Sequence, residues 1–342
     1  MGTPIGDLLV KKPFSLDQIA NEIVAVDGNN TAYQFLASIR NYDGTPLCDS
    51  KGRVTSHLSG FFYRTLNWLE KGIKPVFVFD GPPHVLKEKT LKLRREIRTR
   101  AKEEHEAALE AGDMEAAKKF GSRALHLSSE MIDQSKTLLQ ALGVPVIQAP
   151  QDSEAQCAVM VARSEVVASV SQDYDSLLFG CPELVRNVAT SGKRKIPGKN
   201  AYADIKPEVI LLDECLQKLK LTRQQLIWLG MLLGTDFNDK IPSVGPKTAM
   251  KLIQKATSFE GIIQEAGKEI DFDPKSIEDI FWHPQATPQT PLKFESINGD
   301  RVKSILCDEF EFSVDRIDST LNKIIEKEAE KSKQKTMSSW FS

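Results

Sequence analysis

Four short apolar runs constrain the fold of this chain more than any other feature of its sequence. They span residues 23–26, 75–79, 144–147 and 166–170, and none shows the regular alternation of a strand with one wet face. Such runs suit strands that are buried on both faces of a parallel sheet. Helical patterns lie between them. The sequence therefore predicts an α/β fold with a mostly parallel central sheet flanked by helices.

Acidic residues follow three of these four runs. Asp27 and Asp80 come directly after the first and second runs. Asp173 and Asp175 lie just beyond the fourth. Ligand sites in open α/β sheets lie outside the carboxyl ends of the strands. We therefore expect three separate strands to deliver carboxylates to one edge of the sheet.

Further acids complete a candidate metal site. Asp152 and Glu154 stand where a helix is expected to begin, and Asp236 follows a Gly-Thr pair. A two-metal site needs several oxygen ligands around ions about 4 Å apart, and Mg²⁺ prefers such ligands. Clustered carboxylates repel one another unless cations bind them. The predicted metal ligands are Asp27, Asp80, Asp152, Glu154, Asp173, Asp175 and Asp236.

Simpler readings exist for each acid taken singly. An aspartate after a strand is usually a turn residue or a helix N-cap, and Asp152 or Ser153 could cap the helix that follows. The spacing of the acids also fits a phosphatase as well as a nuclease. From these residues alone, both classes of enzyme stay open.

Bulk composition excludes several classes of protein. The formal net charge is −2, so any nucleic-acid binding must come from local positive charge. The five cysteines are scattered without C-x-x-C spacing, which argues against disulfides and zinc and favours a reducing interior. The sequence shows neither a signal peptide nor an apolar run long enough to span a membrane. We therefore expect a cytoplasmic protein.

Positive charge is concentrated in one segment. Residues 87–134 are helical in composition, and residues 87–102 carry eight Lys/Arg and only two acids. Beyond Asp204 the chain is predicted to be mainly helical, with a strong pattern at 221–233. Residues 284–298 are predicted as a loop, and residues 331–342 as a polar tail with an aromatic end.

The sequence around the acids resembles the flap endonuclease family of structure-specific 5′ nucleases, and its archaeal members in particular. The matching words are Val26-Asp27-Gly28, Val78-Phe79-Asp80-Gly81, Ala149-Pro150-Gln151-Asp152-Ser153-Glu154-Ala155-Gln156, Ser171-Gln172-Asp173-Tyr174-Asp175 and Leu233-Gly234-Thr235-Asp236. The resemblance implies a 5′ nuclease, PIN-like core with a helical arch insertion and a helix–two-turn–helix region. It also implies cleavage of 5′ flaps and a 5′–3′ exonuclease activity in DNA replication and repair.

The resemblance further implies cofactors and a domain plan. We expect two Mg²⁺ ions per site, with Mn²⁺ able to substitute, and a monomer near the nucleoid that binds branched DNA. Residues 1–98 would form the N-terminal half of the nuclease core and the start of the arch. Residues 116–258 would form the internal half with the helix–two-turn–helix, and residues 259–328 a C-terminal helical region.

Basic residues of the arch match family positions that contact DNA. Lys87 and Arg94 match residues beside the scissile phosphate, and their spacing of seven places them on one helix face. Their expected role is electrostatic stabilisation of the transition state. The alternative is a solvated basic face. Phosphate contacts in the arch are expected from Lys89, Lys92, Arg95, Arg98, Arg100 and Lys102.

Other family positions fall outside the arch. Gly2 matches a residue near the active site, Tyr33 one that stacks on a base, although it could also be core, and Arg40 one that touches a phosphate. In the helix–two-turn–helix, backbone amides at Gly245 and the side chain of Lys247 would hold phosphates, and carbonyls there would hold K⁺.

Two residues depart from the family pattern. Asp152 replaces the usual glutamate, so its shorter side chain favours a water-mediated metal contact. Ser243 replaces the usual glycine of the hairpin, where a glycine-dependent backbone conformation is expected.

The C-terminus resembles a sliding-clamp-binding box. Residues 334–342 contain Q-x-x-aliphatic-x-x-aromatic-aromatic, formed by Gln334, Met337, Trp340 and Phe341. A short 3₁₀ turn would bring the apolar three to one side as a plug for a clamp of the proliferating cell nuclear antigen type. The alternative is an inert terminus. A catalytically silent scaffold that binds junctions and the clamp is the other rival function, but none of the seven acids is replaced by a neutral residue.

Overall fold

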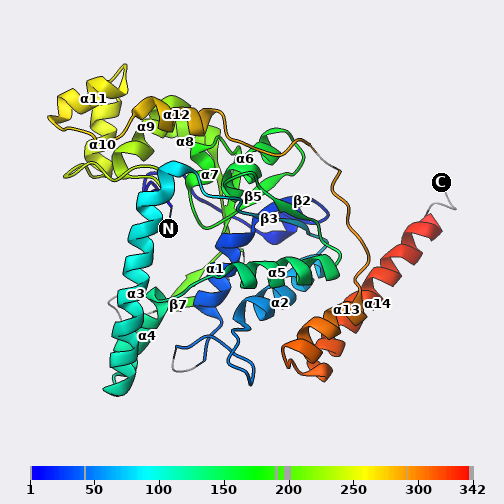
Figure 1. Ribbon diagram of the computed structural model, residues 1–342. Coiled ribbons are helices and arrows are strands. Elements are labelled where there is room, and N and C mark those ends of the chain that lie inside the picture. Colours follow the sequence, from blue (N-terminus) through cyan, green and yellow to red (C-terminus); the bar gives the residue numbers. More distant parts are fainter. Residues whose placement is uncertain (1, 42–43, 189–191, 196–201, 290, 339–342) are drawn as a thin grey trace.

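The computed structural model describes residues 2–41, 44–188, 192–195, 202–289 and 291–338. A seven-stranded sheet with strand order β1-β9-β6-β5-β2-β3-β4 forms its centre (Figure 1). Strands β2 to β6 run parallel to one another, and β9 and the edge strand β1 are each antiparallel to their inner neighbour. The prediction of a mostly parallel sheet is confirmed.

The strands lie close to the predicted apolar runs. Those at the four runs are β2 (Ile23–Asp27), β3 (Lys74–Phe79), β4 (Val146–Gln148) and β5 (Ala168–Val170). The others are β1 (Lys12–Pro13), β6 (Glu183–Arg186), β9 (Glu208–Leu211) and the separate hairpin of β7 (Gly192–Lys195) with β8 (Tyr202–Ile205). Beyond Asp204 the described chain is mainly helical, as predicted, and the strand that begins there is β9. It is a four-residue strand near the sheet edge, too short to give a periodic signal.

Alternate side chains of the central strands enter two different cores. Val24 and Val26 join one apolar cluster, whereas Ala25 between them joins the other. Helices α1 (Gly28–Ser38), α2 (Ser56–Glu70) and α5 (Ser129–Ala141) cover the first face. Helices α6 (Ser153–Ala162), α7 (Asp175–Leu178) and α9 (Arg223–Leu233) cover the second. The predicted layers of helix, sheet and helix are therefore present.

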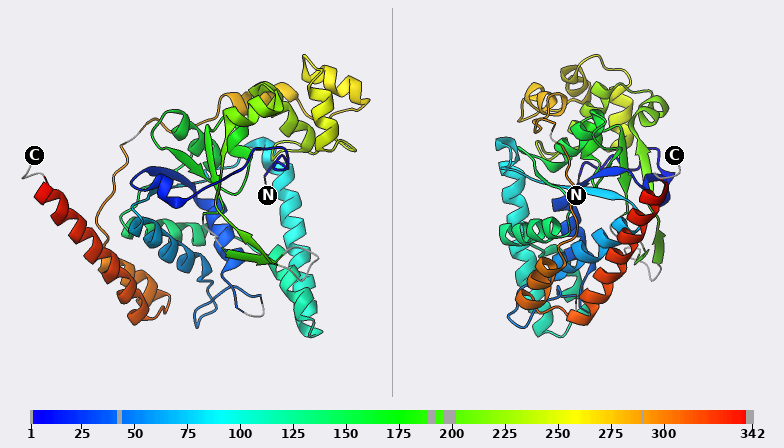
Figure 2. Two further views of the ribbon diagram at one scale, coloured as in Figure 1. Left: turned by 180° about the vertical axis from the view of Figure 1, so that it is seen from behind. Right: turned by 90° about the vertical axis from the view of Figure 1, so that its right-hand side faces the viewer.

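The basic segment forms a helical hairpin that projects from the body (Figures 1 and 2). A 3₁₀ turn, η2 (Val85–Lys87), leads into α3 (Glu88–Glu110), and α4 (Met114–Arg123) returns beside it. Small side chains let the two helices approach closely: Ala101, Ala108 and Ala117 are buried between them. We call this hairpin with η2 the arch.

The remaining elements are helices, and they pack on both faces of the sheet. Helices α8 (Leu212–Leu219), α10 (Pro246–Ile253), α11 (Phe259–Ala266) and α12 (Pro274–Trp282) lie with α9. The described part of the predicted loop 284–298 is confirmed as irregular. It carries the chain to α13 (Gly299–Lys303), the π-helical turn η3 (Ser304–Glu309) and α14 (Val314–Ser338), which pack on the opposite face beside α2.

The described part of the predicted polar tail, residues 331–338, is helical. Helix α14 continues to Ser338, because the Glu- and Lys-rich sequence before it favours helix. Gln334 and Met337 therefore lie on helical backbone, whereas Trp340 and Phe341 lie outside the described residues. Across the described residues, none of the helices is long and apolar enough to cross a membrane.

Candidate active site

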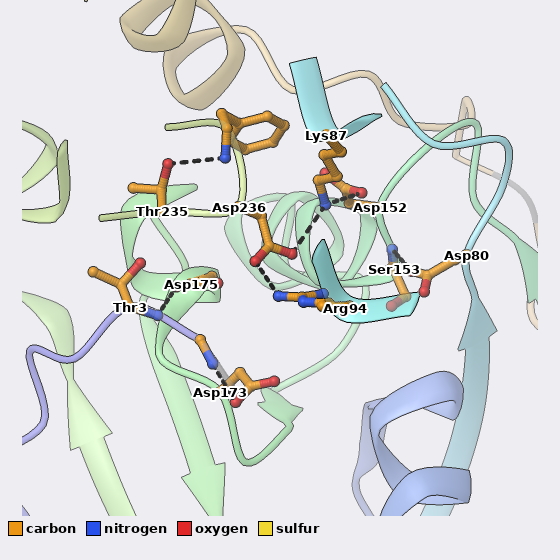
Figure 3. A network of polar contacts seen from close by, with 12 residues as sticks. Thr3, Asp80, Lys87, Arg94, Asp152, Ser153, Asp173, Asp175, Thr235 and Asp236 are labelled. Carbon is orange, nitrogen blue, oxygen red and sulfur yellow. Dashed lines mark hydrogen bonds and ion pairs between the residues drawn. The ribbon is translucent and has the colours of Figure 1, made fainter. Parts of the chain in front are cut away.

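The predicted acids gather at the carboxyl edge of the sheet, below the base of the arch (Figure 3). Asp27 is the last residue of β2 and the N-cap of α1, and its Oδ1 accepts from the Asn30 amide at 3.0 Å. The hydroxyls of Ser153 and Ser171 donate to its two oxygens at 3.0 and 3.2 Å. Asp27 is 3% exposed, so its carboxylate is held in one orientation inside the protein.

Asp80 connects the end of β3 to the start of α6. Its Oδ1 accepts from the Ser153 amide at 2.8 Å, which satisfies one of the free N–H groups at the start of that helix. Gly81 lies so close to the neighbouring loop that an added Cβ would be 2.3 Å from the Ala149 carbonyl oxygen. Only glycine fits this approach. The acid of β3 and the acids of α6 are thereby fixed relative to each other.

Neither Asp152 nor Ser153 caps α6 with its side chain, so the capping alternative is wrong. Asp152 occupies the N-cap position without a capping hydrogen bond. Its Oδ1 instead accepts from Lys87 Nζ of the arch at 2.6 Å. Ser153 turns its hydroxyl to Asp27. Both side chains therefore serve the acidic cluster rather than their own helix.

Asp173 and Asp175 are held by the extreme N-terminus of the chain. The Gly2 amide donates to Asp173 Oδ1 at 2.8 Å, and the Thr3 amide donates to Asp175 Oδ1 at 2.7 Å. Asn30 Nδ2 donates to the other oxygen of Asp173 at 2.9 Å. A Cβ at Gly2 would lie 2.8 Å from Asp173 Cβ, so only glycine fits here. The structure thus places Gly2 at the acidic cluster.

Two cations of the arch reach into the cluster (Figure 3). Lys87 Nζ lies 2.6 Å from Asp152 and 3.7 Å from Asp236, and Arg94 Nη2 pairs with Asp236 at 2.5 Å. Lys87 also lies 4.9 Å from the centre of the Phe237 ring. The alternative of a solvated basic face does not hold for these two residues, because their side chains point at the acids.

The acids carry more negative charge than these two cations balance. Burial, and then the charge of Asp80, raises the pKa of Asp27 from 3.8 to about 7. Burial and the charge of Asp236 raise the pKa of Asp175 to about 6. Burial, followed by the charges of Asp175 and Asp173, raises the pKa of Glu154 well above its usual value. Carboxylates that hold protons near neutral pH for want of counter-charge are suited to a divalent cation.

The opposite shift occurs at Lys87. Burial by itself would lower the pKa of Lys87, but the carboxylates of Asp152 and Asp236 outweigh it and raise the pKa above its usual range. Lys87 therefore stays charged at neutral pH.

The donor set fits hard divalent cations. Among the described residues, no three acidic side chains converge on one point as the ligands of a single, fully protein-bound ion would. Mg²⁺ usually keeps several waters and takes only one or two carboxylates directly, so a wide ring of acids suits it. The cluster offers carboxylate oxygens together with the hydroxyl oxygens of Ser153 and Ser171.

The other predicted DNA contacts have no hydrogen bond or ion pair to the acids among those that the described residues show. Tyr33 is 39% exposed on α1, so the core alternative for it is wrong. Arg40 donates to the carbonyls of Leu36 and Gly44 at 2.9 and 3.0 Å. In the arch, Arg95 is exposed and Arg98 Nη1 lies 3.0 Å from His126 Nδ1.

In the helix–two-turn–helix region, Gly245 and Lys247 begin α10. The turn before them contains Ser243, whose φ is 65°. The departure from glycine therefore leaves a left-handed conformation in place, now adopted by a serine.

Several residues of the site were missed in the sequence. Asn30, Ser153 and Ser171 donate to the acids, and Thr3 does so through its amide. Ser153 and Ser171 stand inside the acidic sequence words, next to Asp152 and two residues before Asp173. Their position was a usable signal, whereas nothing local pointed to Thr3.

Comparisons with known proteins agree over the whole chain. The XPG N-terminal domain model matches residues 6–101, and the XPG I-region model matches residues 143–236. Flap endonuclease 1 of Pyrococcus furiosus is 46% identical over 342 residues, covering 100% of this chain and 99% of that protein. Flap endonuclease 1 of Methanocella arvoryzae is also 46% identical, covering 100% of both chains.

Solved structures give the same picture. The structure of flap endonuclease-1 from Methanococcus jannaschii superposes with a TM-score of 0.75 at 35% identity, covering 96% of this chain and 100% of that one. The catalytic core of Rad2 in complex with a DNA substrate superposes with a TM-score of 0.69 at 24% identity, which speaks for the fold.

Proposed function

The chain belongs to the flap endonuclease family and is a structure-specific 5′ nuclease; from that premise we propose that it removes 5′ flaps from branched DNA during replication and repair, and degrades 5′ ends as a 5′–3′ exonuclease. Its family implies a divalent metal. We propose two Mg²⁺ ions per site, with Mn²⁺ able to substitute. The observation that carries this proposal is the group of buried, protonation-prone carboxylates beneath two arch cations.

The acids fall into two groups around the carboxyl edge of the sheet. Asp27, Asp80, Asp152 and Glu154 come from β2, β3 and the start of α6, and would surround one ion. Asp173, Asp175 and Asp236 would surround the other. The ions would supply an activated water and neutralise charge on the scissile phosphate. Ser153, Ser171 and Asn30 hold the carboxylates in place for this task.

Lys87 and Arg94 would act on the phosphate. Both already reach the acidic cluster from the arch, and they present positive charge beside the acids. With a divalent ion held by Asp152 and Asp236, Lys87 and Arg94 would be free to turn to the phosphodiester. Fixed positive groups at developing negative charge are a large source of transition-state stabilisation.

The DNA path extends from this site in two directions. Arg95, Arg98 and other arch cations would follow the phosphates of the single-stranded flap. Gly245 and Lys247, at the start of α10, would hold the backbone of the duplex, with K⁺ bound by carbonyls of the preceding turn. Tyr33 and Arg40 would contact the DNA near the cut. Recognition would then depend on the shape of the junction.

The C-terminal box would tether the enzyme to a sliding clamp. Gln334, Met337, Trp340 and Phe341 would engage a clamp of the proliferating cell nuclear antigen type, and the protein would act as a monomer. Tethering raises the effective concentration of enzyme at DNA junctions.

A labelled double-flap DNA tests the proposal. Incubation with Mg²⁺ should release the 5′ flap and leave a nick, and a chelator should stop cleavage. Binding without cleavage in both conditions would favour the silent scaffold. Hydrolysis of a small phosphomonoester in preference to the flap would favour the phosphatase.

A further inference from the structure

Tyr174, which stands between Asp173 and Asp175, has its ring enclosed on several sides. The Arg186 guanidinium carbon lies 4.0 Å from the ring centre, and the Lys11 ammonium lies 5.4 Å from it. The backbone of Gly6 also contacts the ring, since an added Cβ there would be 2.5 Å from the Tyr174 hydroxyl. The ring therefore has little freedom to move.

Arg186 contacts the turn that carries the two acids at more than one point. Its Nε donates to the Gln172 carbonyl at 3.0 Å, and its Nη1 donates to the Tyr174 hydroxyl. The same Nη1 pairs with Glu208 Oε1 at 2.5 Å. Gln172 directly precedes Asp173, and Tyr174 directly follows it. The guanidinium of Arg186 thus contacts the residues on both sides of Asp173.

Strands β6 and β9 hold Arg186 in place. Arg186 ends β6, and Glu208, which begins β9, is its partner in the antiparallel ladder. Their side chains are only 14% and 21% exposed, so their ion pair is less screened by water than a surface pair. A guanidinium is planar with donors in a fixed fork, so its contacts define distances as well as charge.

We infer that Arg186 is a positioning residue for the metal site: by holding Gln172 and Tyr174, it fixes the turn that presents Asp173 and Asp175. The inference rests on the proposed function, in which these two acids hold a divalent metal. Gly2 and Thr3 orient the carboxylates themselves. Arg186 instead contacts the Gln172 carbonyl, directly before Asp173, and the side chain of Tyr174, which lies between the two acids.

The purely structural alternative is that Arg186 and Glu208 only stabilise the pairing of β6 with β9. The two accounts differ in what the loss of Arg186 changes. A structural role predicts lower stability with unchanged metal affinity. A positioning role predicts weaker metal binding even in protein that is fully folded.

The test is calorimetric titration of the full-length protein with Mn²⁺ in the absence of DNA. We expect Arg186→Met to weaken Mn²⁺ binding by about 10- to 100-fold, the usual effect of removing a group that orients metal ligands. Arg223→Met is the matched control. Arg223 also lies over an aromatic ring, 4.3 Å from the centre of Trp282, and donates to the Phe281 carbonyl at 2.8 Å. Its loss should lower the melting temperature and leave Mn²⁺ affinity unchanged.

Conservative variants keep the test decisive if Arg186→Met does not fold. Arg186→Lys keeps the charge next to Glu208 but loses the fork, so its Mn²⁺ affinity should stay reduced. Tyr174→Phe keeps the ring and loses the hydroxyl contact, and should give a smaller loss. In flap cleavage, Arg186→Lys should raise the Mn²⁺ concentration for half-maximal rate more than it lowers the rate at saturating Mn²⁺.

Two results would overturn the inference. One is Arg186→Met, or Arg186→Lys if the first does not fold, binding Mn²⁺ as tightly as the wild type. The other is full recovery of affinity by lysine, which would assign the effect to charge rather than to geometry. A wild-type protein that neither binds Mn²⁺ nor cuts the flap would overturn the proposed function, and this inference with it.

Discussion

At the scale of single residues, Asp175 and Ser243 are both held in unfavourable states, the first by burial of its carboxylate and the second by its backbone conformation. Asp175 is buried among other acids, and the amide of Thr3 holds its carboxylate. Its pKa, raised from 3.8 to about 6, lies above the value for an unfolded chain. The protonated side chain therefore contributes stability that is complete below about pH 4 and is lost as the pH rises through about 6.

Replacing this charge should separate stability from activity. Without divalent metal at pH 8, Asp175→Asn should raise the free energy of unfolding by about 1 to 2 kcal/mol, because it removes a destabilised carboxylate and keeps an acceptor for Thr3. Chemical denaturation in chelator measures this gain, which should vanish near pH 4. The variant should bind flap DNA and fail to cut it. Retained turnover would contradict the assignment of Asp175 to the metal site.

Ser243 is a second strained residue, with a φ of 65° in the turn before α10. A side chain in the left-handed region costs about 1 to 2 kcal/mol, whereas glycine pays about 0.5 to 1 kcal/mol in chain entropy. Ser243→Gly should therefore stabilise the protein by about 0.5 to 1 kcal/mol in thermal or chemical unfolding. Ser164→Gly, at a φ of 58°, should behave alike. A lower melting temperature in Ser243→Gly would show that its side chain contributes more than the strain costs.

The acids themselves were predictable from sequence, but their supports only partly so. Asp27 and Asp80 follow apolar strands, and that signal is local. The backbone donors to the carboxylates of Asp173 and Asp175 are the amides of residues 2 and 3, more than 170 positions away. Sequence spacing cannot predict contacts over such a separation, because these contacts depend on where the N-terminal residues lie in the folded protein.

At the scale of elements, helix α2 contributes an uncharged histidine to the core. His57 is fully buried, and its Nε2 lies 3.0 Å from Gln134 Oε1 of α5. Because Gln134 Oε1 can only accept, Nε2 carries the proton, and Nδ1 has no partner among the described residues. Burial, partly offset by the contact with Gln134, lowers the pKa of His57 to about 4.

This histidine should make α2 sensitive to acid. Its folded pKa lies below the unfolded value of 6.5, so its contribution is complete above about pH 6.5 and is lost as the pH falls toward 4. The loss should reach about 3 kcal/mol in the free energy of unfolding. His57→Gln, which cannot titrate, should show a flatter stability profile between pH 7 and pH 4. An equally steep decline in that variant would place the acid sensitivity elsewhere.

Elements were predictable to the extent that their signals are local. Unbroken apolar runs located β2 and β3, and charge density located the arch. The break of the arch into two helices at Gly112 and Asp113 was not recognised, although a glycine with a φ of 71° followed by an aspartate N-cap produces it. Strands β6 and β9 have four residues each and depend on pairing with each other, which no short window reveals.

At the scale of the whole molecule, the first described residues and the last described helix lie in different parts of the fold (Figure 2). The N-terminus lies at the acids, and α14 projects from the body beside α2 (Figure 2). Lys323 and Lys327 pair with Glu70 of α2 at 3.1 and 3.3 Å, and Ile324 is buried against the core. These anchors all precede residue 334, so the proposed clamp-binding box is not needed to hold α14 in place.

Removing residues 334–342 should therefore separate recruitment from catalysis. We expect the truncated protein to melt as the wild type does and to cut flaps at the same intrinsic rate, but to lose stimulation by the sliding clamp. The double variant Trp340→Ala, Phe341→Ala should reproduce this in a full-length chain. Stimulation that survives both changes would show that the clamp is bound elsewhere or not at all.

The sequence does not predict the path by which the chain after α12 passes from one face of the sheet to the other. The irregular segment after α12 is tied down by contacts with distant residues. The Glu295 amide donates to the Gly143 carbonyl at 2.9 Å, and the Thr287 amide donates to Gln156 Oε1 at 2.7 Å. A Cβ at Gly143 would lie 2.1 Å from the Glu295 carbonyl oxygen, so the segment lies directly on this glycine. Composition predicts a loop here but does not predict where in the fold that loop runs.

The irregular segment between α12 and α13 should be a site of limited proteolysis. Lys293 is exposed on it, whereas Val302, Leu306 and Ile317 beyond it are buried in the core of the far face. Brief trypsin treatment should nick the chain after Lys293 without releasing the C-terminal piece. The two fragments, residues 1–293 and 294–342, should therefore elute together from a sizing column and separate only in denaturant.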